Sequence, residues 1–89
     1  MNIEYTIQIW HEDQQFVAHA MPLDVMSSGL TPEQARTALV EAVDLFLATA
    51  AQMDTLDEVL QESGYQLVSG HWVSPSWVAT ERHSALIAA

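Results

Sequence analysis

Alternating apolar and polar residues fill the first part of the chain and predict strands. Residues 3–10 alternate strictly, which is typical of a strand with one buried face. The buried face is expected to hold Ile3, Tyr5, Ile7 and Ile9, and the opposite face Glu4, Thr6, Gln8 and Trp10. Polar residues 11–14 predict a turn and residues 15–21 a second strand, so the pair is expected to form a β-hairpin. A third strand over residues 23–29, ended by Gly29, completes an antiparallel meander.

A helix with clear start signals follows the third strand. Thr31 can cap its N-terminus, Pro32 suits the first helical position, and Gln34 completes a capping box. Apolar residues then recur at helical spacing and predict a face that covers the sheet. Its expected members are Ala35, Leu39, Ala42, Val43, Phe46, Ala50 and Met53, opposite Thr37, Glu41, Asp44 and Ala48.

The remainder of the chain predicts a second helix and a less regular segment. Thr55, with Glu58 three residues on, is a second capping signature, and Gly64 marks the helix end. The inner face of this helix is expected to hold Leu56, Val59 and Leu60. Residues 65–78 are rich in aromatic and β-branched residues and contain turn signals, so they predict strands or irregular structure. Residues 77–89 fit helix or strand, and a last strand is favoured.

These elements predict one α+β domain over residues 1–89. The expected fold is an antiparallel sheet of three to four strands with two helices packed on one face, in the order β-β-β-α-α-β. The chain has no cysteine, which argues against a disulfide framework or a thiolate zinc site. Its start does not follow the signal-peptide pattern, and its apolar stretches are too short for a membrane span. A cytoplasmic protein is the expectation.

Net charge is the bulk property that says most about possible partners. The chain has twelve acidic residues and only two basic ones, Arg36 and Arg82, with no lysine, so the formal net charge is −10. Nucleic-acid binding depends on clustered Lys and Arg, and we therefore expect this chain alone to bind neither DNA nor RNA. Two interpretations of the acidity stay open. The acids keep the protein soluble, or their field steers a basic partner toward it.

Chemistry-bearing residues are present but scattered. No His-Glu-x-x-His motif, glycine-rich phosphate loop or nucleophile elbow occurs, and the carboxylates are expected on different faces. His11 and Asp13 could share a metal with His71, although a solvated turn is the favoured interpretation, and His19 is expected to be structural or on the surface. We therefore expect no catalytic, metal or cofactor site and no enzyme, with a hydrolase or metal enzyme as the least favoured hypothesis.

Tryptophans and the apolar C-terminus predict contact surfaces. Trp10 is expected to lie on the outer sheet face and to serve an interface, whereas Trp72 and Trp77 either do the same or fold back to close the core. Residues 84–89 are uncharged and largely apolar. They are expected either to complete their own sheet or to pair with a second copy, and a dimer or larger homo-oligomer is favoured.

The first 50 residues also resemble a known family. The stretches YTIQIW, QFVAHAMPLDVMSSG and TPEQARTALVEAVDLFLATA are similar in order to the N-terminal domain of HicB antitoxins. The residues that carry the resemblance are Phe16, Val17, Ala18, His19, Pro22, Leu23, Gly29, Thr31, Glu33, Ala35, Glu41, Ala42 and Phe46. This chain departs from the family pattern because the turn around Pro22 lacks a glycine. Residues 54–89 are also too short and acidic for the DNA-binding domain that many members append.

The resemblance implies a stand-alone HicB-like domain with a partial RNase-H-like fold. It also implies an antitoxin that sequesters a small, basic, mRNA-cleaving toxin of the HicA type and blocks its active site. The residues expected at a partner interface are Trp10, His19, Leu23, Asp24, Trp72 and Trp77. The alternative is a homo-oligomeric structural or assembly protein without a toxin partner.

Overall fold

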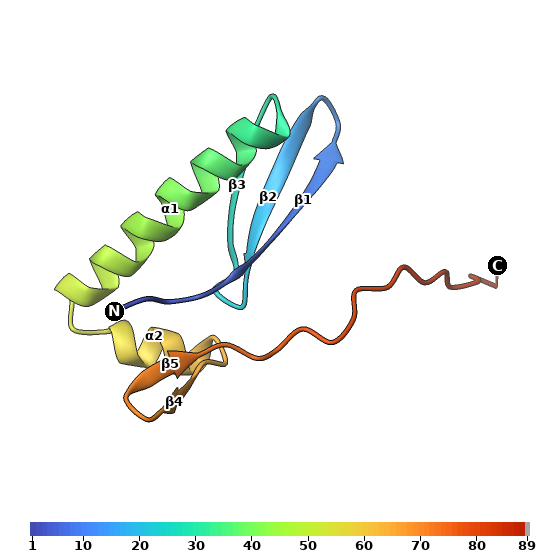
Figure 1. The fold of residues 1–89 in the computed structure, drawn as a ribbon. Helices are drawn as coiled ribbons and strands as arrows, with labels where there is room; N and C mark the ends of the chain where they lie inside the picture. The colour runs from blue at the N-terminus through green and yellow to red at the C-terminus, as the bar shows by residue number, and fades with distance from the viewer. Residues whose placement is uncertain (89) are drawn as a thin grey trace.

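A three-stranded antiparallel sheet forms the N-terminal half of the protein. The computed structural model describes residues 1–88 and places β1 at Thr6–Glu12, β2 at Gln15–Met21 and β3 at Val25–Gly29, in the order β1-β2-β3 (Figure 1). The hairpin and the meander predicted from the alternation are confirmed. Asp13 in the first turn adopts a left-handed backbone conformation, with φ of 56°, which aspartate tolerates better than most residues.

The two faces of the sheet differ as the sequence pattern indicates. Ala18 and Ala20 are fully buried on the inner face, where Ile7 and Ile9 pack beside them. On the outer face, Gln8 of β1 lies opposite His19 of β2, and His19 lies opposite Met26 of β3. Because successive strand residues point to opposite sides, this register places Trp10 on the outer face as well.

Helix α1, Pro32–Gln52, covers the inner face of the sheet. The backbone N–H of Gln34 donates to the hydroxyl of Thr31 at 3.1 Å, so the predicted N-cap is confirmed. In a capping box the Gln34 side chain would accept from the N–H of the cap residue, Thr31. Here its oxygen accepts instead from the N–H of Leu30, at 3.1 Å. The helix then follows β3 closely: a Cβ added to Gly29 would lie 2.6 Å from the backbone nitrogen of Ala35. Glycine is therefore needed at this junction for space.

Helix α1 is longer than the sheet that it covers. Its 21 residues span about 31 Å, whereas the five to seven residues of each strand span about 16 to 23 Å. Leu39 and Val43 are fully buried over the sheet, but Phe46, further along the helix, keeps 36% of its surface exposed. Met53, at the helix end, is mostly exposed. The expectation that Phe46 and Met53 are core residues is therefore wrong, although the helix phase was correct.

The C-terminal half closes the end of the molecule below α1 (Figure 1). Helix α2, Leu56–Glu62, is followed by strands β4, Gln66–Val68, and β5, His71–Val73. Leu60, Tyr65 and Trp72 are buried in the same core as the sheet residues. The Tyr65 hydroxyl donates to the backbone carbonyl of Glu4, which ties this half to the N-terminal segment.

Several details of the C-terminal half differ from expectation. Thr55 does begin α2, but its hydroxyl donates to the carbonyl of Ala50 and caps no N–H of α2. Gly64 ends the helix with a φ of 101°. Strands β4 and β5 form a separate two-stranded sheet, so the three-stranded sheet gains no fourth strand. Helix α2 lies beyond the end of the three-stranded sheet (Figure 1). The α+β fold class is confirmed, in the order β-β-β-α-α-β-β.

The segment after β5 has no regular structure. Residues 74–88 form neither helix nor strand, so the prediction of a last strand there is wrong for the isolated chain. The physical reason is that the segment meets no strand edge in its own chain, and a strand needs such a partner for its backbone groups. Within residues 1–88, no helix has the length and apolar character needed to cross a bilayer.

Candidate partner-binding surface

All twelve carboxylate side chains lie on the protein surface. Each acidic residue is exposed, and no charged residue is buried among residues 1–88. Within these residues the carboxylates form two salt bridges, both with histidine: Asp24 with His19, and Glu81 with His83. The arginines neutralise none of them. The protein therefore presents a negative field to solvent that its own side chains barely compensate.

One open hollow of about 560 Å³ combines apolar and acidic groups, and we call it the acidic hollow. It lies where the β2–β3 turn, α1 and α2 meet. Its apolar lining includes Leu23 from the turn, Phe46 from α1 and Val59 from α2. Asp24 and Glu62 supply exposed carboxylates on two sides. The complete lining is His19, Met21, Pro22, Leu23, Asp24, Phe46, Val59, Glu62 and Ser63.

A histidine–aspartate pair organises the turn side of the acidic hollow. His19 Nε2 lies 2.6 Å from Asp24 Oδ1, with the imidazole largely covered and the carboxylate exposed. The backbone N–H of Asp24 also donates to the carbonyl of Ala20 at 2.8 Å, which closes the turn. Asp24 has a positive φ of 60°, a conformation in which aspartate is several-fold enriched. The turn thus holds one carboxylate oxygen on the imidazole and leaves the group facing solvent.

Trp10 extends this surface onto the next strand. Its ring meets the ring of His19 edge-on, with the centroids 6.2 Å apart and the planes at 80°. The indole N–H donates to the carboxylate of Glu12 at 3.1 Å. The ring stays exposed on the outer sheet face, as the sequence predicted. Trp10, His19 and Asp24 therefore form a continuous row from β1 to the β2–β3 turn.

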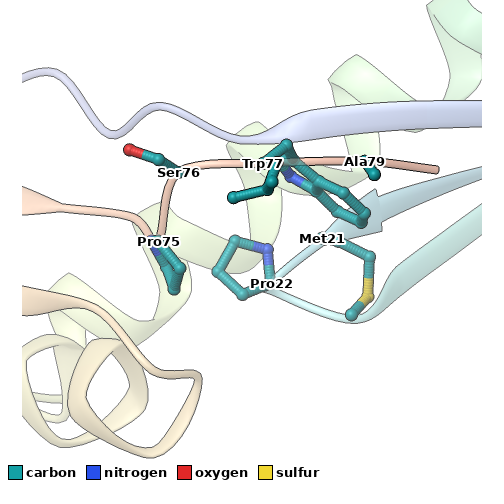
Figure 2. A pocket seen from close by; sticks show the side chains of 7 residues that line it. Met21, Pro22, Pro75, Ser76, Trp77 and Ala79 are labelled. Atoms are coloured by element: carbon teal, nitrogen blue, oxygen red, sulfur yellow. The ribbon is translucent and has the colours of Figure 1, made fainter.

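Trp77 lies on the other side of the same turn. It lines a second open hollow of about 520 Å³ with Met21, Pro22 and residues 75–79. Figure 2 shows the indole of Trp77 lying over Met21, with Pro22 and Pro75 beside it. This hollow shares Met21 and Pro22 with the acidic hollow, so the two are adjacent. Trp77 remains about half exposed, partway between the two alternatives predicted for it.

Two of the six residues expected at an interface are instead buried inside the chain. Trp72 is only 8% exposed and packs in the core, so the alternative in which it folds back to close the core is the one observed. Its position in β5 explains this, because the β4–β5 hairpin turns that side chain inward beside Tyr65. Leu23 is also buried, and it contributes only to the floor of the acidic hollow.

The residues considered for metal chemistry do not come together. His11 stacks on Phe16, with ring centroids 4.7 Å apart, and His71 lies on β5 in the other sheet. Within residues 1–88, no three histidine or carboxylate side chains are grouped closely enough to hold a metal ion. Asp13 lies in the first hairpin turn, as the favoured interpretation had it, whereas His11 lies in strand β1 opposite Phe16 and not in the turn.

Phe46, Val59 and Glu62 belong to the acidic hollow but were not predicted as surface residues of a site. Phe46 and Val59 had been assigned to inner helix faces by their spacing, and Glu62 had no assigned role. The missing information was the overhang of α1 beyond the sheet, which brings α2 up to the β2–β3 turn. The sequence did contain one indication of this arrangement: the predicted helix is longer than the predicted strands.

The fold and this surface define a small acidic α+β protein with an open, carboxylate-bearing hollow. Comparison of the chain with protein-family models, with curated proteins and with solved structures gives no match.

Proposed function

We propose that the chain is a protein-binding module, without a catalytic step of its own, whose partner is a small basic protein. The observation that carries the proposal is the set of twelve exposed carboxylates with no arginine paired to any of them in residues 1–88. Such a field attracts a basic protein and accelerates its association. Solubility alone asks for less, since a net charge of magnitude about 2 to 8 suffices for a small domain.

The acidic hollow suits one basic side chain of that partner. Lysine and arginine bury an apolar stem and keep a charged head in contact with polar groups. Leu23, Phe46 and Val59 offer the apolar wall for the stem. Asp24 and Glu62 offer carboxylates for the head, and a hydrogen bond between two charged groups is stronger than a neutral one. Trp10 and Trp77 lie beside the turn as flat side chains of the kind enriched in interfaces.

The partner we propose is an mRNA-cleaving toxin of the HicA type. The support is the resemblance of residues 3–50 to HicB antitoxins, together with the three strands and the capped helix found over the same residues. An inhibitor of such a toxin needs no chemistry, because occupying the active site is enough. A toxin that cleaves mRNA acts where mRNA is translated, and we therefore place this module in the cytoplasm.

The test uses the short gene expected beside this one, encoding a basic chain of about 60 to 80 residues with a double-stranded-RNA-binding pattern. The purified product of that gene should cleave mRNA, and an equimolar amount of this chain should stop the cleavage. Changing Asp24→Asn and Glu62→Gln together should weaken the complex at least tenfold. The matched control, Glu33→Gln with Asp57→Asn, removes two exposed charges outside the acidic hollow.

Two outcomes would count against the proposal. Unchanged mRNA cleavage in the presence of excess chain would refute the antitoxin assignment. Equal weakening by the two double variants would show that the acidic hollow is not the contact and that only overall charge matters.

A further inference from the structure

The C-terminal tail, residues 74–88, leaves the folded body as an exposed chain. Its C-terminal part runs away from both sheets (Figure 1). Beyond Trp77 its large apolar side chains have almost no cover, with Leu86 99% exposed and Val78 97% exposed. The radius of gyration is 15.6 Å, against about 12 Å for a compact chain of this length. A tail of this kind exposes apolar surface that a soluble monomer normally buries.

The tail also has the composition and length of a strand. Residues 78–87 would span about 33 Å when extended, which exceeds the seven-residue length of β1. Within residues 1–88 the tail makes no backbone hydrogen bond outside its own neighbours, and its only side-chain bond joins His83 to Glu81. Its N–H and C=O groups are therefore free to pair with another strand.

The outer edge of β1 offers the matching site. β1 pairs only with β2, so one side of its backbone has no strand beside it. Helix α1 lies mainly over β3 and β2 and least over β1, and Ile7 and Ile9 of β1 remain only partly buried. A strand added at this edge would place alternate side chains on the inner face and cover both isoleucines. The opposite edge is shorter, because β3 has five residues.

We propose that residues 78–87 of one copy add as a fourth strand to the β1 edge of a second copy, and that the exchange is reciprocal in a two-fold dimer. Addition of a strand to an open sheet edge supplies backbone hydrogen bonds for affinity and alternate side-chain contacts for specificity. A two-fold axis lets each copy donate one tail and accept one, so no edge is left to extend the assembly.

Charge favours the tail as the segment that crosses between copies. Glu81 and Arg82 are its only formally charged side chains, so the whole net charge of −10 lies on residues 1–73. Two such bodies repel each other, but a neutral tail can reach across the gap. Salt screens the repulsion, and the dimer should therefore tighten as ionic strength rises. A complex with a basic protein should weaken instead, which separates this proposal from the one above.

The first experiment measures mass in solution. Full-length protein at about 100 μM in about 0.5 M salt should scatter light as twice the monomer mass of 9.9 kDa. Deletion of residues 78–89 should give a monomer with an unchanged circular dichroism signal, because residues 78–88 belong to no helix or strand. As a matched pair, Leu86→Asp should lower the dimer affinity at least tenfold, and Ala85→Asp, which adds the same charge on the opposite face of the strand, should lower it less. A full-length monomer, or a dimer that survives the deletion, overturns the proposal.

The second experiment locates the acceptor. A synthetic peptide of residues 76–89 should bind the tail-deleted protein, and the same peptide with alternate backbone nitrogens methylated should not, since methylation removes the donors that pair strands. A spin label attached to the peptide through Ala85→Cys, on the face opposite to Leu86, should broaden amide signals of β1. Equal binding of both peptides, or broadening confined to β3 or the acidic hollow, overturns strand addition at β1.

Discussion

At the residue scale, Tyr65 links parts of the chain that lie far apart in sequence. Its hydroxyl donates to the carbonyl of Glu4, 61 positions away, and its ring is buried in the core. Burial raises the pKa of Tyr65 above its ordinary value of 10.0, and the neighbouring Tyr5 and Glu4 raise it further. Burial also raises the pKa of Tyr5, with a contribution from the charge of Asp44. The folded state thus holds both phenol protons more tightly than the unfolded state does.

The first prediction is a loss of stability at alkaline pH that depends on Tyr65. Because the folded pKa is raised, the contribution is fully present below pH 10 and is lost as the pH rises through the folded value. The chain has no lysine or cysteine to titrate in the same range. Tyr65→Phe should lower the free energy of unfolding at pH 7 by about 1 kcal/mol, through the lost hydrogen bond. It should also flatten the decline above pH 10. Urea unfolding at pH 7 and at pH 10.5 measures both effects, and an identical decline in the variant would contradict the prediction.

The second prediction separates a core residue from one that lines the acidic hollow. Leu39 is fully buried over the sheet, so Leu39→Ala should lower the free energy of unfolding by about 2 to 5 kcal/mol. Phe46 is 36% exposed and lies at the open acidic hollow, so Phe46→Ala should cost only about 1 to 2 kcal/mol. Chemical denaturation of the two variants tests the order. A larger loss for Phe46→Ala would mean that the hollow is closed in solution.

At the element scale, local signals predicted the boundaries of helices and turns well. The Thr31 cap depends on residues within one helical turn, and the structure has it. The turn at Ser69 and Gly70 also follows local chemistry, since both residues have positive φ. The strands β1 and β2 follow directly from alternation in the sequence. Such features were predictable because their causes lie within a few residues.

Relations between elements were not predictable in the same way. The spacing of α1 correctly placed Phe46 on the inner face, but whether the sheet extends under that residue depends on strand lengths and packing. The same holds for Trp72, whose burial depends on where the β4–β5 hairpin docks. His19 and Asp24 are both expected at an interface, but the sequence does not predict their 2.6 Å contact, which requires the particular turn between β2 and β3.

At the scale of the whole molecule, charge is the property that the sequence states most directly. The net charge of −10 is known from composition alone, and the structure adds that every carboxylate is exposed. What composition could not give is the acidic hollow, because its two carboxylates come from the β2–β3 turn and from α2. The general surface character was thus predictable, and its one concave feature was not.

The third prediction follows from that charge. The isolated protein should not retard duplex DNA or RNA in a gel at about 0.15 M salt, because a phosphate-binding surface needs clustered cations. The two arginines lie on α1 and in the tail, 46 positions apart in a chain without lysine. A basic protein of similar size serves as the positive control. Retardation at micromolar protein that disappears with added salt would show that the prediction is wrong.

The topology has a consequence for the order in which the protein folds. Every strand pairs with its neighbour in sequence, and α1 packs directly on the strands that precede it. Local connectivity of this kind favours rapid folding. The first three strands and α1 can therefore assemble while α2 and the second hairpin are still unstructured. Since Val59 and Glu62 of α2 line the acidic hollow, that hollow is complete only once α2 has packed in place. Only a chain that has folded through its second half would then offer the proposed basic partner the whole hollow.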